Sequence, residues 1–355
     1  MSQQTTESYI KLPLDHYGHQ GAPSEWWWHI GTLVAKDGRK FGFEINGAFL
    51  LGHHFTQIEI TDVSSNKNYQ KMHVFLLDPA NWVEYDSSKP WYVKMIPLLT
   101  PFDGGVKMQQ VGDNPLNMLV QASFIDAGVQ CQMILNFNQE QNKPLLVWGT
   151  GRTPEMVNPD GKTPLEQYNF YYSLTNLRAS GYIIIGSEVI EVTGLTWMDH
   201  QYGYFGNPAS GAEGQVHWML QDIQLPDGIH LSNSYVMKKD EQIIENHRYE
   251  SYATVLFPTG ESKLVGSYTT AMGPTFTENG IIYYMNFKVE IDDHGSGLNA
   301  VFHVKSLLDD QIFHTVNNYE GIGSVEATFG DSDVITTGTA WIEQTYGKPK
   351  SATRF

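Results

Sequence analysis

The sequence is poor in cysteine and in charged residues. Its 355 residues include one cysteine, Cys131, which can form neither an internal disulfide nor a thiolate metal site. A disulfide-stapled fold and a zinc ribbon are therefore excluded. Charged side chains make up 17% of the chain, and 22 Lys and Arg against 39 Asp and Glu give a net charge of −17. Because such an acidic surface repels a phosphate backbone, nucleic acid is excluded as a partner.

Long apolar runs are also missing from the sequence. No stretch approaches the ~20 apolar residues that a membrane span requires. The first residues, MSQQTTES, lack the basic and apolar regions of a secretory signal. We predict a soluble, cytoplasmic protein without a membrane span, with a periplasmic or secreted mature form as the alternative. Transient contact with a membrane surface and the oligomeric state both stay open.

Aromatic residues, at 13%, and short alternating segments are abundant. Phe41, Phe43 and Ile45 alternate with Gly42 and Glu44, which is the period of a strand with one apolar face. Many such runs end in turn residues, and no convincing helical stripe of four turns occurs. This pattern predicts an all-β protein of the antiparallel sandwich or barrel class. The predicted hairpin turns lie at 126–128, 186–187, 258–260 and 292–295.

An internal repeat indicates two related β domains. The pattern Gly-x-x-Trp-x-acid-x-x-Tyr-Gly at 194–203 recurs 144 residues later, at 338–347. Trp28 lies ten residues before the Gly of an Asp-Gly turn, and Trp218 precedes a similar turn by the same spacing. A turn-rich stretch at 205–215 separates the halves. We predict domains 1–207 and 208–355, with an apolar ligand bound at a barrel mouth or between the domains.

Several enzyme classes and a metal site are not indicated. The sequence lacks the motifs Gly-x-Ser-x-Gly, Gly-x-Gly-x-x-Gly and His-Glu-x-x-His, and it lacks a P-loop. The 13 histidines invite a metal hypothesis, notably His53 with His54 and His16 with His19. Adjacent residues on a strand point to opposite faces, so His53 and His54 cannot share one ion without a bulge. We predict no metal.

The first candidate cluster begins at Glu25, where three tryptophans precede His29. On a strand, Glu25, Trp27 and His29 share one face. Glu25 is interpreted either as a proton-handling group whose pKa apolar neighbours raise, or as a carboxylate tied to a backbone turn. Trp28, matched by Trp218, is interpreted as structural.

The second cluster spans 197–202. Trp197, Asp199 and Gln201 face one way, whereas Met198, His200 and Tyr202 face the other way. An acid beside an indole suits chemistry at a carbon-carbon double bond, since the acid donates a proton and the aromatic face stabilises the cation. The alternative is a structural pair, because the repeat preserves both a Trp and an acid.

These motifs resemble a known superfamily. The segments 25–31, 171–174 leading to Gly181, 194–203 and 319–321 are similar to the lipocalin-like carotenoid 1,2-hydratases (hydroxyneurosporene synthases). Their relatives include kievitone hydratase-like proteins and fungal lipocalin-like Diels-Alderases. The resemblance implies two tandem lipocalin-like antiparallel β-barrels with a pocket at or near their interface. It also implies a long apolar unsaturated substrate, no cofactor, and Asp199 as the proton donor.

We therefore predict a cofactor-independent enzyme for proton-initiated hydration or cyclisation at a C=C bond of an isoprenoid, polyene or polyketide-like substrate. Trp27 and Trp197 would face the cation, and the other catalytic groups would assist Asp199. The alternatives are a Diels-Alderase-type pericyclase, which works mainly by proximity, and a carrier of apolar ligands without chemistry. The predicted catalytic residues are Asp199, His200, Tyr172 and Glu25. The predicted substrate-binding residues are Trp27, Trp28, His29, Trp197, Gln201, Tyr202, His217 and Trp218.

Overall fold

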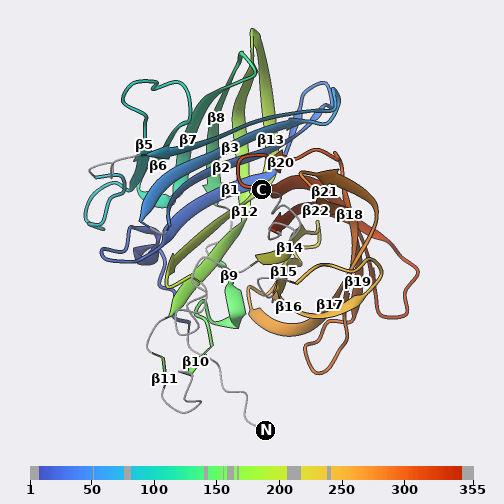
Figure 1. Ribbon diagram of the computed structural model, residues 1–355. Helices are drawn as coiled ribbons and strands as arrows, with labels where there is room; N and C mark the ends of the chain where they lie inside the picture. The colour runs from blue at the N-terminus through green and yellow to red at the C-terminus, as the bar shows by residue number, and fades with distance from the viewer. Residues whose placement is uncertain are drawn as a thin grey trace, which may run out of the picture. The chain divides into compact units, whose positions relative to one another are not determined.

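The computed structural model forms two compact units, Met1–Gly214 and Gln215–Phe355. It describes residues 8–50, 52–75, 81–139, 143–154, 156–157, 164–165, 168–205, 217–237 and 241–345. The domain boundary predicted between 207 and 208 lies outside these residues. Both units are built almost wholly from antiparallel strands, which confirms the all-β prediction (Figure 1). Among the described residues, no helix is long and apolar enough to cross a membrane.

The first unit is one strongly curved sheet. Its strand order is β4-β3-β2-β1-β13-β12-β8-β7-β6-β5, with β9 paired to β12 and a separate β10-β11 ribbon. The edge strands β4 and β5 do not pair with each other in the described part of the chain, so this unit is a half-barrel. The prediction of two antiparallel β-barrel units is confirmed, with the first barrel open between β4 and β5. The strands are β1 (Glu25–Ala35), β2 (Lys40–Leu50), β3 (His53–Asp62), β4 (Lys67–Phe75), β5 (Tyr92–Met95), β6 (Gly105–Val111), β7 (Asn114–Asp126), β8 (Val129–Gln139), β9 (Leu145–Leu146), β10 (Met156–Val157), β11 (Pro164–Leu165), β12 (Asn169–Ile185) and β13 (Glu188–Gly203). Two short 3₁₀ helices are η1 (Leu14–His16) and η2 (Val147–Gly149).

The second unit is a closed barrel. Strand β19 pairs with both β18 and β21, which joins the two ends of the strand order β19-β18-β17-β16-β15-β14-β22-β21, and β20 adds to β21. Its strands are β14 (His217–Gln224), β15 (His230–Met237), β16 (Arg248–Leu256), β17 (Ser262–Glu278), β18 (Ile281–Ile291), β19 (Ala300–Ser306), β20 (Ile312–Phe313), β21 (Asn318–Phe329) and β22 (Thr336–Thr345).

Turn chemistry explains the hairpins. Asp126 pairs with Val129 across a two-residue turn whose central residues, Ala127 and Gly128, have φ of 47° and 83°. Two left-handed residues match the twist of the flanking strands, and glycine adopts that conformation without strain. The predicted turn at 126–128 is therefore confirmed.

The pairing register revises one repeat match. Trp218 on β14 lies opposite Thr345, whereas Trp26 on β1 lies opposite Gln201. Because Gln201 and Thr345 occupy the same position of the repeated motif, Trp218 corresponds to Trp26 and not to Trp28. The match of Trp218 with Trp28, which was based on equal spacing to the Asp-Gly turns, is wrong by two residues. The reason is that the β1-β2 hairpin is two residues longer on this side than the β14-β15 hairpin.

Strands β1 and β13 in the first unit are buried on both faces. One face contributes Trp27 and Met198 to the hydrophobic core of the unit, which we call the core face. The opposite face carries Trp28, Trp197 and Asp199, and these side chains are buried as well. We call it the outer face. The candidate residues are thus distributed over two separate environments.

Candidate functional site

The alternation of β13 divides the predicted catalytic residues into two groups. Asp199 projects to the outer face together with Trp197, and His200 projects to the core face together with Tyr202. Tyr172 on β12 pairs with His200 and shares its face. The structure therefore does not bring Asp199 together with the other predicted catalytic side chains, because the sheet backbone separates them.

Asp199 is fully buried and held by two donors. Its Oδ1 atom accepts hydrogen bonds from Ser173 Oγ at 2.5 Å and from Trp197 Nε1 at 2.7 Å. Ser173 lies directly opposite Asp199 on β12, and Trp28 lies opposite it on β1. The register of three neighbouring strands thus places the carboxyl group between a hydroxyl group and an indole.

Burial governs the protonation of Asp199. Loss of solvation raises its pKa to about 6, although hydrogen bonds with Ser173, Trp197 and Tyr171 act in the opposite direction. A carboxyl group with this pKa carries a proton in about one molecule in ten at pH 7, against about one in a thousand for an ordinary aspartate. It can therefore donate that proton, which an ordinary surface aspartate cannot do efficiently.

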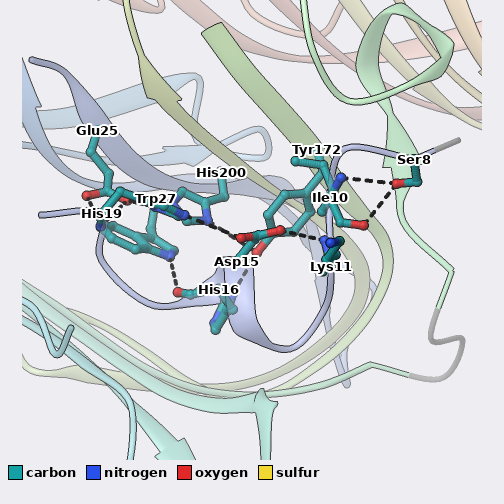
Figure 2. Close-up of polar contacts among 10 residues, drawn as sticks. All are labelled: Ser8, Ile10, Lys11, Asp15, His16, His19, Glu25, Trp27, Tyr172 and His200. Atoms are coloured by element: carbon teal, nitrogen blue, oxygen red, sulfur yellow. Dashed lines mark hydrogen bonds and ion pairs between the residues drawn. The ribbon is translucent and has the colours of Figure 1, made fainter. Parts of the chain in front are cut away.

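Glu25 lies on the core face, between two histidines (Figure 2). Its Oε1 atom is 2.7 Å from His19 Nδ1 and 3.1 Å from His200 Nε2. The backbone N–H of His19 also donates to the carboxylate, at 3.0 Å from Oε2. Burial would raise the pKa of Glu25, but the hydrogen bonds from the two histidines outweigh it and lower that pKa. Of the two interpretations from the sequence, the structure favours the carboxylate tied to the backbone, because the pKa of Glu25 is lowered and not raised by its surroundings.

The two histidines differ in protonation. Burial would lower the pKa of His19, but Asp15 and Glu25 raise it to about 9. His200 is fully buried, and loss of solvation lowers its pKa despite the nearby Glu25. Near neutral pH, His19 therefore carries the positive charge that balances Glu25, and His200 is neutral.

A hydrogen-bonded chain continues from His200 into the core. The Tyr172 hydroxyl lies 3.2 Å from His200 Nδ1 and 2.8 Å from His16 Nδ1. Burial raises the pKa of Tyr172 well above its ordinary value and lowers that of His16, so both side chains are neutral. Trp27 stacks on His200 with ring centroids 4.2 Å apart, and its Nε1 atom donates to the His16 carbonyl. The Trp27 ring is thereby fixed in the core.

The other predicted substrate-binding residues are dispersed. His29 is fully buried and lies 5.1 Å from the Phe137 ring, and no group among the described residues forms a hydrogen bond with either of its ring nitrogens. Tyr202 stacks on His19 with centroids 3.4 Å apart. Gln201 is buried on the outer-face side of β13, whereas His217 and Trp218 lie half-buried on β14 of the second unit.

Three groups on the core face have the composition of a metal centre. His19, Glu25 and His200 each offer a ligand atom, and these atoms lie within 4.8 Å of one another. The histidine pairs considered in the sequence did not identify this set, because its members come from the segment after η1, from β1 and from β13. Ser173 and Tyr171 were also missed as partners of Asp199. Their position opposite the 199–201 segment follows from strand register, which no local pattern specifies.

Comparison with known proteins gives a family and two similar folds. The AttH-like family model matches residues 104–349. A putative AttH from Nitrosomonas europaea has a similar structure, with a TM-score of 0.71 and 17% identity over 95% of this chain and 97% of that one. Kievitone hydratase from Nectria haematococca aligns with a TM-score of 0.69 and 13% identity over 95% of this chain and 93% of that one. No curated protein matches in sequence. The predicted lipocalin-like superfamily, with its kievitone hydratase-like relatives, is confirmed.

Proposed function

We propose that this chain, which belongs to the AttH-like family, is an enzyme that protonates a carbon-carbon double bond of an apolar small molecule through Asp199. The observation that carries the proposal is the state of this carboxyl group. It is fully buried, its pKa lies at about 6, and its Oδ1 atom is held by Ser173 and Trp197. Because Ser173 and Trp197 both donate to Oδ1, we place the transferable proton on Oδ2.

The proposed reaction is balanced without an oxidant or a reductant. The O–H bond of Asp199 breaks as a C–H bond forms at one alkene carbon, which leaves a positive charge on the other carbon. Water adds to this carbon and returns a proton to the carboxylate, or a second double bond of the substrate adds and a neighbouring carbon loses the proton. The carboxyl group is regenerated in either case, so the enzyme needs no cofactor.

The outer face offers the apolar groups that such a cation needs. Trp28 lies opposite Asp199, and Trp197 donates to it, so two indoles flank the carboxyl group. An indole face attracts a cation through its quadrupole, by about 0.5–2 kcal/mol. These two residues take the role that we expected of Trp27 and Trp197, since Trp27 projects to the core face.

The fold relationship supports hydration as one outcome. Kievitone hydratase shares the fold of this chain and is, by its name, a hydratase. At 13% identity this supports the architecture and leaves the substrate of this chain open. We propose an isoprenoid, polyene or polyketide-like substrate because two indoles flank the candidate acid, and aromatic side chains favour an apolar ligand.

Deuterium incorporation tests this function. The enzyme is incubated in D₂O with an acyclic carotenoid, a polyprenol and kievitone, and the products are identified by mass spectrometry. Hydration adds one deuterium at carbon together with a hydroxyl group, and proton-initiated cyclisation exchanges one carbon-bound hydrogen for deuterium. An isomeric product without deuterium would indicate the pericyclase alternative. Recovery of ligands that copurify unchanged, with no product from any compound, would indicate a carrier. Either of these last results would refute the proposed proton donation.

A further inference from the structure

A second site lies on the core face, away from Asp199. His19, Glu25 and His200 converge there from three separate parts of the first unit (Figure 2). Glu25 Oε1 lies 2.7 Å from His19 Nδ1 and 3.1 Å from His200 Nε2. The proposed proton donation uses none of these side chains, so their convergence calls for a separate explanation.

The spacing of the ligand atoms fits a small divalent cation. A tetrahedral ion with bonds of ~2.0–2.1 Å holds its ligands about 3.4 Å apart. Glu25 Oε1 lies nearer than this to both nitrogens, at 2.7 Å and 3.1 Å, because it is now hydrogen-bonded to them, and all three atoms lie within 4.8 Å of one another. Two imidazole nitrogens and one carboxylate oxygen favour zinc and similar transition metals over magnesium or calcium.

Each imidazole also has a partner on its other nitrogen. His19 Nε2 lies 3.6 Å from Asp15 Oδ1, and His200 Nδ1 lies 3.2 Å from the Tyr172 hydroxyl. In metal sites, such partners hold the hydrogen on the far nitrogen, which frees the near nitrogen to bind the ion. Asp15 is itself fixed, because the Lys11 backbone N–H donates to its other oxygen at 2.5 Å. The set therefore has both ligands and the groups that orient them.

The site is also accessible from solvent, and the negative charge of the protein attracts cations. The side chains of His19 and Asp15 are 25% and 23% exposed, whereas those of Glu25 and His200 are almost fully buried. A cation can therefore reach the buried carboxylate past His19. The net charge of −17 increases the local concentration of cations around the protein.

We propose that His19, Glu25 and His200 form a binding site for one divalent transition metal ion of the zinc type. His19 Nδ1, His200 Nε2 and the Glu25 carboxylate are the protein ligands, and the fourth position faces the partly exposed side of His19. The ion links the segment after η1 to β1 and β13, so it stabilises the first unit. It lies across the sheet from Asp199 and takes no part in proton donation.

Metal binding and thermal stability test this site without an activity assay. Full-length protein is stripped with EDTA, and Zn²⁺ binding is measured by calorimetry. Co²⁺ is used as a spectroscopic probe, because its visible absorption reports a tetrahedral nitrogen and oxygen environment. We expect stoichiometric binding of both ions, a Tm that rises when Zn²⁺ is restored, and a loss of affinity of more than ~10-fold in His19→Ala.

The matched control is His314→Ala. His314 is an exposed histidine that also lies between two carboxylates, at 3.6 Å from Glu278 and 3.7 Å from Asp310. This variant should bind Zn²⁺ like the wild type. Absence of stoichiometric binding to the wild type, or equal binding by His19→Ala, would overturn the proposal. If His19→Ala does not fold, a wild-type Co²⁺ spectrum without tetrahedral bands overturns it equally.

Discussion

The two units share a strand framework but carry different side chains at equivalent positions. Strand β13 corresponds to β22, and the register places Gln344 where the first unit has His200. Tyr319 pairs with Gln344 as Tyr172 pairs with His200, so the tyrosine is common to both units. The titratable imidazole is therefore specific to the first unit.

In the second unit, Tyr319 and its pairing partner Gln344 form hydrogen bonds that hold neighbouring strands and loops together. Gln344 donates to the Tyr284 carbonyl and accepts from the Tyr284 N–H, both at 2.9 Å. The Tyr319 hydroxyl donates to the Leu308 carbonyl and accepts from Gln311 Nε2. All of these groups are amides, hydroxyls or backbone atoms. The repeated positions thus maintain the fold in the second unit, whereas the first unit has His200, a ligand of the proposed metal site, at the position of Gln344.

The outer faces differ in a similar way. In the first unit Trp197 donates to Asp199 itself, whereas in the second Trp341 donates to Glu320 at 3.1 Å. Glu320 lies opposite Glu343 and occupies the position of Ser173. A repeated Trp-x-acid motif therefore does not imply the same protonation chemistry in both units.

The largest expected effect is a difference in turnover between variants of the two repeated acids, Asp199 and Glu343. Asp199→Asn should lower turnover roughly 100- to 10,000-fold, because the amide keeps the shape but cannot donate the proton. The same change in the second unit, Glu343→Gln, should leave turnover within about threefold of wild type. Initial rates and circular dichroism of both variants check this. Equal losses in the two variants would show that the motif acts structurally in both units.

Next in size is a change to the second unit. Gln344→Leu should lower the free energy of unfolding by about 2–4 kcal/mol, because the buried N–H and carbonyl groups of Tyr284 both lose their partner. Urea denaturation measures the effect. Thr337→Val, an exposed change on the same strand, should stay within about 0.5 kcal/mol of wild type. A stable Gln344→Leu variant would contradict a structural role for the amide.

A smaller effect is expected in the pH dependence of stability. Burial raises the pKa of Asp199 from its ordinary 3.8 to about 6. The folded protein therefore holds this proton more tightly than the unfolded chain does. The resulting contribution to the free energy of unfolding is fully present below pH 3.8 and is lost as the pH rises through 6. Asp199→Asn stays neutral. Its stability relative to wild type should therefore rise between pH 4 and pH 7 by on the order of 1–3 kcal/mol. Parallel unfolding curves against pH would show that Asp199 ionises as it does in water.

The smallest expected effect concerns His29. Within the part of the chain that the structure describes, its ring nitrogens have no hydrogen-bond partner, and burial lowers its pKa to about 3. His29→Leu should raise the free energy of unfolding at pH 7 by about 1 kcal/mol, since an unsatisfied polar group is removed. The unfolded chain binds a proton at His29 below pH 6.5 and the folded chain does not, so the advantage should grow in acid. The exposed change His303→Leu should show neither effect.

Local periodicity was sufficient to predict much of the fold. The alternation over 197–202 correctly assigned Asp199 and His200 to opposite faces, and the turn at 126–128 follows from its own residues. Two β-barrel units were predicted correctly, but whether the first barrel closes was not predicted, because closure depends on whether the distant edge strands β4 and β5 meet. A sequence pattern contains no information on that long-range pairing.

The candidate site was less predictable for the same reason. Ser173 reaches Asp199 through the register of β12 on β13. His16, at the end of η1, contacts Tyr172, and His19, in the loop after η1, contacts Glu25. No sequence periodicity specifies where this segment before β1 packs. The residue types were visible in the sequence, whereas their partners depend on tertiary structure.

The proposed reaction requires that Asp199 be a buried acid that is partly protonated near neutral pH. Selective ¹³C labelling of aspartate and NMR titration of the carboxyl resonance test it without any substrate. We expect a resonance that titrates near pH 6 and is missing from Asp199→Asn. An Asp199 resonance that titrates at the ordinary value of 3.8 would rule out this acid as the proton donor.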